Sequence, residues 1–226
     1  VWGAGVFLLH PLNSEAASYV SARTDLLSTT FILLAVWLCL GRPAIWRWGL
    51  IGAALVGAAL SKETGLLGVP LVVLTLLVCR PQLPASALAA PLWIGLGAVL
   101  GAMWAPVLAW LSMPSNAGGT YFTWPEFALL QLTAAWHLIA LLVWPRGFSI
   151  DHDVLALGPM WSAAAVVLTC ASIALIAWGW RRAPVVAWAL AWGGIVIAPR
   201  LVFHTTEFLH EYQMYLVLAG LSLLFG

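Results

Sequence analysis

The chain has 226 residues, of which 63% are hydrophobic and only 8% are charged. Soluble domains carry about 25% charged residues, so this composition excludes an ordinary water-soluble protein. The net charge of +1 provides no basic field, and we expect no nucleic-acid partner. Several apolar runs reach the roughly 17 to 25 residues that cross a bilayer core, which predicts an integral membrane protein in contact with the lipid bilayer.

The apolar runs follow one another with short connections rich in Pro, Gly and Arg. This pattern predicts an all-α fold, a polytopic transmembrane bundle of about seven to nine hydrophobic helices. No internal repeat interrupts it, so we expect a single transmembrane domain over residues 1–226. Both ends of the chain fall inside apolar runs, and we expect a fragment of a longer protein. The predicted helical segments are 1–9, 24–40, 45–60, 65–79, 86–111, 127–144, 159–180, 183–199 and 212–226.

Arginines in the connections indicate the sidedness of the bundle. By the positive-inside tendency, the cytoplasmic ends are marked by Arg42, Arg47, Arg80, Arg181 and Arg182. The helices alternate correctly only if segment 127–144 does not cross, so we predict that it is a re-entrant or interfacial helix. All eight acidic residues then fall on the outer side, which predicts that the polar chemistry takes place there.

The first polar cluster lies between His10 and Leu27, directly before an apolar segment. On a helix, Glu15 and Arg23 share one face and Asp25 lies on its flank. Ionisable groups near membrane depth are costly, and they are tolerated where they face a cavity or pair with each other. We predict a polar cavity here. The alternative for Glu15 is an ordinary acidic residue at a helix N-terminus.

The second cluster is Ser61-Lys62-Glu63-Thr64, a predicted turn between two helix ends that contains the only lysine. A lysine beside a helix start can bind phosphate, because it adds a point charge to unpaired backbone N–H groups. An ordinary turn with a snorkelling lysine is the equally weighted alternative.

The third cluster is Asp151-His152-Asp153. Two carboxylates beside a histidine could bind a divalent cation such as Mg²⁺ or Mn²⁺, or act as acid and base. A solvated loop is the alternative, and we predict no resident metal.

The fourth cluster places Arg200, His204, Glu207 and Glu211 at a spacing that forms one polar helical face. We expect Arg200 to bind an anionic group there, with a solvated juxtamembrane helix as the alternative. No complete zinc ligand set is present in this spacing.

Several of these residues fall in motifs with a recognisable order. His10-Pro11-x-x-x-Glu15-Ala16, followed by Val20-x-x-Arg23-x-Asp25-Leu26-Leu27, resembles the signature of the transmembrane O-mannosyltransferases with tetratricopeptide repeats (the TMTC family) and their bacterial relatives. These are C-type (GT-C) glycosyltransferases. Later landmarks of the family resemble Ser61-Lys62-Glu63-Thr64, Pro145-x-x-Phe148-Ser149-x-Asp151 and Glu211-x-x-x-Tyr215-Leu216. Tyr212 stands where the family usually has arginine.

The resemblance implies a GT-C-like bundle and a hexosyltransferase. Such an enzyme transfers a mannose-like sugar from a polyprenyl- or dolichyl-phosphate donor to a protein or glycan hydroxyl on the extracytoplasmic side. The general base of these enzymes precedes the His-Pro motif, so we expect it upstream of Val1. We expect the bacterial inner membrane, or the endoplasmic reticulum membrane in a eukaryote. The expected substrate-binding residues are His10, Glu15, Arg23, Asp25, Lys62, Glu63, Asp151, Arg200, His204, Glu207 and Glu211.

Two other functions remain open from the sequence. A non-catalytic membrane subunit or scaffold derived from a GT-C fold would explain the departure at Tyr212 and the missing loop. A transporter would also gather charges in a membrane, but transporters often contain repeated halves, and no repeat is found here.

Overall fold

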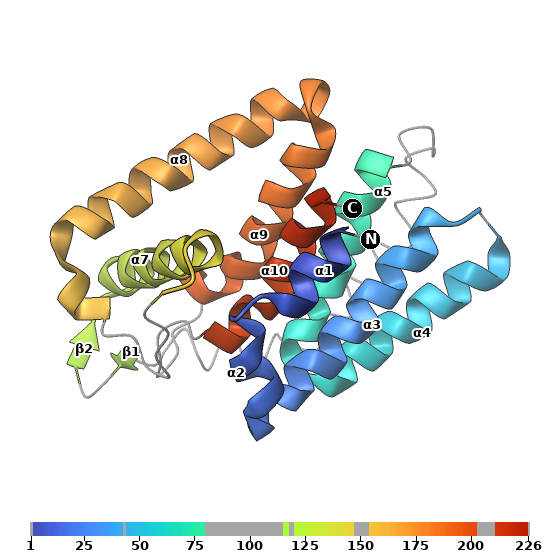
Figure 1. Cartoon of the computed structure of the whole chain (residues 1–226), viewed down its shortest axis with the longest axis horizontal. Helices are drawn as coiled ribbons and strands as arrows, with labels where there is room; N and C mark the ends of the chain where they lie inside the picture. The colour runs from blue at the N-terminus through green and yellow to red at the C-terminus, as the bar shows by residue number, and fades with distance from the viewer. Residues whose placement is uncertain are drawn as a thin grey trace. The chain divides into compact units, whose positions relative to one another are not determined.

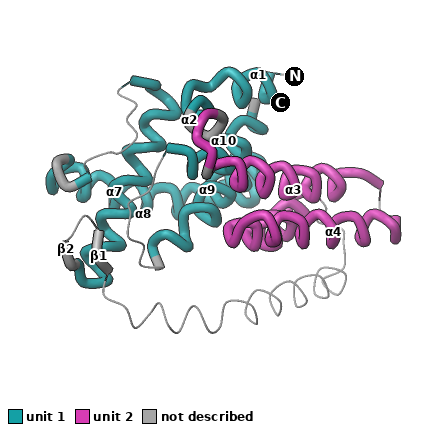
Figure 2. The backbone as a smooth tube through the Cα atoms, turned by 90° about the horizontal axis from the view of Figure 1, so that it is seen from below, with its two compact units in different colours: residues 1–15, 104–226 teal, residues 16–103 magenta. Residues whose placement is uncertain are grey.

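The computed structural model describes residues 2–42, 44–79, 115–117, 120–146, 154–202 and 211–225, and almost all of them are helical (Figure 1). The exception is a short antiparallel hairpin of β1 (Ser115–Ala117) and β2 (Thr120–Phe122), in which Asn116 pairs with Tyr121. The predicted all-α helical fold is therefore confirmed. The chain forms two compact units (Figure 2), unit 1 with residues 1–15 and 104–226 and unit 2 with residues 16–103.

Unit 2 is built on an antiparallel helical hairpin. Its described elements are η1 (Val20–Ala22), α3 (Arg23–Leu40), α4 (Ile45–Ser61), η2 (Glu63–Leu67) and α5 (Gly68–Cys79). Helix α3 packs against both α4 and α5. Small residues permit this close approach: Ala58 of α4 is buried, and a Cβ on Gly57 would lie 3.1 Å from the ring of Phe31.

Unit 1 contains most of the remaining helices. Beside the β1–β2 hairpin, its described elements are α1 (Trp2–Leu9), α7 (Trp124–Val143), η3 (Val154–Leu157), α8 (Gly158–Arg182), α9 (Pro184–Val202), η4 (Glu211–Met214), α10 (Tyr215–Ser222) and η5 (Leu223–Phe225). A short helix, α2 (Asn13–Ser18), lies where the chain passes from unit 1 to unit 2. The helices match the predicted segments to within a few residues, and segment 86–111 lies outside the described residues.

The core of unit 1 is apolar and joins α7, α9 and α10. Its buried residues are Leu12, Ala134, Ala135, Leu138, Leu141, Val154, Ile197, Met214 and Val217. Beside it, the buried side chain of Trp192 donates its indole N–H to the carbonyl oxygen of Leu216 at 2.8 Å. The polar end of this large side chain is therefore satisfied inside an apolar unit.

Four described helices, α3, α7, α8 and α9, are long and apolar enough to cross a membrane. Helix α8 exposes apolar side chains along nearly its whole length. Of its 25 residues only Ala165 and Gly179 are buried, and large apolar side chains such as Val167 and Ile173 are exposed. A helix that is apolar on all sides requires an apolar surrounding, which the bilayer core provides. The chain is a membrane protein.

Helix α7 was predicted to lie in the interface or to re-enter the membrane. It is one unbroken helix of 20 residues, long enough to cross. Its contacts with α8 do not follow the register of an antiparallel hairpin, because Thr133 contacts Ser162 whereas Trp136, further along α7, reaches Thr169 of α8. Consecutive spans with a short connection must be antiparallel. This arrangement favours interfacial placement of α7, which stays a prediction.

Candidate functional site

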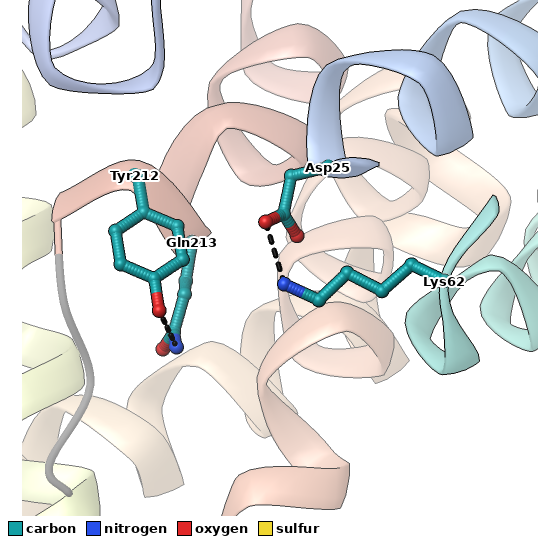
Figure 3. Close-up of polar contacts among 4 residues, drawn as sticks. All are labelled: Asp25, Lys62, Tyr212 and Gln213. Carbon is teal, nitrogen blue, oxygen red and sulfur yellow. Dashed lines mark hydrogen bonds and ion pairs between the residues drawn. The ribbon is translucent and has the colours of Figure 1, made fainter. Parts of the chain in front are cut away.

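An ion pair joins the first turn of α3 to the end of α4 in unit 2. The Lys62 Nζ atom donates to the Asp25 Oδ2 atom at 2.6 Å, and Figure 3 shows the two side chains directed toward each other. Their side chains are only 17% and 11% exposed, respectively. The pair connects two of the predicted polar clusters, whose residues are 37 positions apart in sequence. The sequence analysis treated those clusters separately.

The helical hairpin explains why the two residues meet. Helices α3 and α4 pack against each other as an antiparallel hairpin, so the N-terminus of α3 lies beside the C-terminus of α4. Asp25 lies in the first turn of α3, where the helix dipole favours an anion. Lys62 caps the C-terminal end of α4, where the dipole favours a cation. Each charge therefore stabilises its own helix end as well as its partner.

A tight turn fixes the backbone of Lys62. The chain is extended at Lys62, with φ −161° and ψ 151°, and its carbonyl oxygen accepts the N–H of Gly65 at 2.9 Å. The Lys62 N–H donates to the carbonyl oxygen of Ala58 at 3.1 Å. The Ser61 hydroxyl donates to the carbonyl oxygen of Gly57 at 2.7 Å. The bond to Ala58 satisfies one of the four carbonyl groups that the C-terminal end of α4 leaves without a helical partner. The lysine is thus positioned by backbone geometry.

Ser28 adds an unsatisfied hydroxyl near the pair. It lies one turn after Asp25 on α3 and is buried, at 2% exposure. Its Oγ atom has no hydrogen-bond partner among the described residues. A buried hydroxyl without a partner is costly, by about 1–3 kcal/mol, so its presence calls for an explanation. Ser28 is not among the residues predicted from the sequence, although its spacing of three from Asp25 places it on nearly the same helical face.

The other predicted residues of unit 2 are more open. Arg23 is exposed at the start of α3, and Glu63 is exposed in η2 immediately after Lys62. Glu15 lies in α2, and its side chain is outside the described residues. The structure therefore gives unit 2 a buried neutral pair together with an exposed cation and an exposed anion.

His10 has a structural explanation. Its Nδ1 atom accepts the N–H of Leu12 at 3.2 Å, which leaves the proton on Nε2. The Nε2 atom lies 3.0 Å from the carbonyl oxygen of Leu142 and donates to it. In this tautomer the neutral imidazole ties the connection after α1 to the end of α7. Both ring nitrogens are engaged, so the predicted role of His10 in substrate binding receives no support from the geometry.

Two further predicted residues lie in unit 1. Arg200 is half-buried in the last turn of α9, directly after Pro199. Glu211 is buried at the start of η4. Next to it, the Gln213 amide donates to the Tyr212 hydroxyl at 3.2 Å (Figure 3). Buried carboxylates in membrane proteins are functional candidates, and Glu211 keeps that status.

The remaining candidates are not covered by the structure. Asp151, His204 and Glu207 lie outside the described residues, as does the whole Asp151-His152-Asp153 triplet. Within the part of the chain that the structure describes, no group of three or more His, Cys, Asp and Glu side chains could hold a metal ion. The idea of a divalent cation at the triplet stays a prediction.

Comparison of the chain with protein-family models, with curated proteins and with solved structures finds no match. The function is therefore inferred from the residues and their geometry.

Proposed function

We propose that the chain belongs to a membrane glycosyltransferase that takes a hexose from a polyprenyl-phosphate donor and transfers it to a hydroxyl of a protein or glycan. The observation that supports this most directly is the Asp25–Lys62 ion pair. Two motifs that resemble landmarks of GT-C enzymes are distant in sequence, and one charged residue of each meets the other at 2.6 Å. Paired ionisable groups on membrane helices are functional candidates by default.

The proposed reaction makes three demands on the protein. It needs cations for the departing lipid phosphate, a carboxylate base for the acceptor hydroxyl, and apolar helix surface for the lipid tail. Lys62 is a partly buried cation, and the exposed Arg23 lies on the helix of its partner Asp25. We also retain Arg200 as a candidate phosphate ligand of unit 1. The Asp25 carboxylate is already engaged by the Lys62 ammonium group, so we do not assign it as the base.

The experiment measures sugar transfer by the full-length protein in detergent. It uses radiolabelled polyprenyl-phosphate mannose and glucose, and follows donor consumption. We expect Lys62→Gln to reduce turnover at least a hundredfold, because removal of one preorganised cation from a developing oxyanion costs about 3–4 kcal/mol. Arg47→Gln is the matched control. Arg47 is also a cation of α4, but it lies at the opposite end of that helix, over the ring of Trp46.

A charge-swapped double variant separates function from folding. Loss of Lys62 alone removes the ion-pair partner of the buried Asp25 carboxylate, and breaking a buried pair costs roughly 3–5 kcal/mol of stability. Asp25→Lys combined with Lys62→Asp keeps an ion pair but exchanges the positions of its charges. We expect this variant to remain folded and to lack transfer activity. A wild-type protein that neither turns over nor binds either donor would contradict the proposal and favour a scaffold.

A further inference from the structure

The charge of Lys62 is already compensated in the structure. Its ammonium group contacts the Asp25 carboxylate, and both side chains are more than four-fifths buried. A phosphate ligand of Lys62 must therefore compete with Asp25 for the same cation. This competition decides which phosphates the site can recruit.

Ser28 provides a second observation at the same end of α3. Its buried hydroxyl has no partner among the described residues, and it follows Asp25 by one helical turn. A hydroxyl can donate one hydrogen bond to a phosphate oxygen, which would remove the cost of leaving it unsatisfied. A phosphate site needs a cation and a neutral hydrogen-bond donor, which Lys62 and Ser28 could provide. In the structure the cation Lys62 is already paired with the Asp25 carboxylate.

The chemistry of transfer changes the charge of the phosphate. The donor is a phosphodiester with one negative charge. The acceptor oxygen forms a bond to the anomeric carbon and releases its proton to a carboxylate base. The bond between the anomeric carbon and the phosphate oxygen breaks, and its electron pair stays on that oxygen. The product is a phosphate monoester, which carries about −1.5 to −2 charges at neutral pH.

We propose that Asp25 is a positioning residue that keeps Lys62 paired until this extra charge develops, so that the site selects phosphate monoesters over diesters. This inference rests on the proposed function for its reaction but not for its binding test. A diester with one charge gains little by displacing a carboxylate that also has one charge. A monoester, or a transition state that approaches it, has more charge and recruits both Lys62 and the Ser28 hydroxyl. An interaction made only late in the reaction lowers the barrier without tightening donor binding.

The test compares three probes with the full-length protein in detergent: dodecyl phosphate, methyl dodecyl phosphate and inorganic phosphate. The first two share a tail and differ in charge. For the wild type we expect dodecyl phosphate to bind roughly tenfold more tightly than the diester, as one extra charge-assisted hydrogen bond provides. We expect inorganic phosphate to bind more weakly than dodecyl phosphate because it lacks the tail.

Two variants examine the mechanism. Asp25→Asn removes the carboxylate charge that competes for Lys62, so we expect diester binding to tighten and the tenfold preference to disappear. Ser28→Ala removes a hydroxyl that has no described partner, so it should fold normally and lose part of the monoester preference, roughly threefold to tenfold. If Asp25→Asn does not fold, the monoester preference of Ser28→Ala alone tests the inference.

Three outcomes would overturn the inference. The first is a wild type without preference for the monoester. The second is an unchanged preference in both variants. The third is inorganic phosphate binding as tightly as dodecyl phosphate, which would show that no lipid phosphate is recognised. The proposed function fails separately: a protein that shows the monoester preference but transfers no sugar would retain this site and lose the glycosyltransferase assignment.

Discussion

Replacement of Gly65 by alanine should disrupt the turn that positions Lys62. Gly65 is buried in η2, and a Cβ at this position would overlap the carbonyl group of Ala58 and lie 2.6 Å from the amide nitrogen of Ala59. These are backbone atoms in the last turns of α4, so relief requires η2 to move away from the helix. Overpacking of a buried site costs about 1–3 kcal/mol, and obstruction by backbone places this variant at the upper end.

The stability of detergent-solubilised Gly65→Ala can be measured by thermal or SDS-induced unfolding. A loss of about 3 kcal/mol corresponds to a change of more than a hundredfold in the folded-to-unfolded ratio. Gly52→Ala is the matched control, since Gly52 lies in α4, the helix against which η2 packs, and nothing lies within 4 Å of an added Cβ. The control should be neutral or more stable by about 0.5–1 kcal/mol, because alanine is a better helix former. Equal stability of the two variants would refute the close packing of η2 against α4.

Two further predictions concern unit 1. Trp192→Phe keeps most of the buried ring but removes the hydrogen bond to the Leu216 carbonyl, and it should lower the unfolding free energy by about 1–3 kcal/mol; an unchanged value would show that this carbonyl finds another donor. The placement of α7 can be tested with single cysteines at the exposed positions Thr123 and Arg146, which flank the helix. If α7 lies in the interface, both cysteines should react with a membrane-impermeant thiol reagent from the same side of sealed vesicles. Labelling from opposite sides would establish that α7 crosses the membrane.

The helices were predictable because bilayer thickness constrains the sequence strongly. A run of apolar residues long enough to cross has few alternatives to a helix, since backbone groups in lipid must be satisfied internally. Segment 24–40 thus corresponds to α3, Arg23–Leu40, and segment 159–180 to α8, Gly158–Arg182. The sequence also indicated where charged residues gather, but it did not show which of them form pairs.

The Asp25–Lys62 contact could have been predicted from hairpin geometry. The two residues lie at nearly equal distances in sequence from the connection 41–44, so an antiparallel hairpin brings them to the same level. The separate treatment of the two motifs concealed this relation. The engagement of both His10 nitrogens was not predictable in the same way, because one partner is the Leu142 carbonyl at the far end of α7. Main-chain acceptors leave no signal in residue type.

The pairing changes how the lysine should be understood. A bare lysine at the centre of a membrane helix costs about 2.5–3.5 kcal/mol, and less toward the interface, so an uncompensated Lys62 would oppose insertion and folding. Asp25 reduces that cost by making the buried site neutral. Under the proposed function, phosphate binding is an exchange in which the ligand replaces the Asp25 carboxylate as the counter-ion of Lys62. The proposed selection for monoesters then follows, because only a ligand with more negative charge than the carboxylate gains from that exchange.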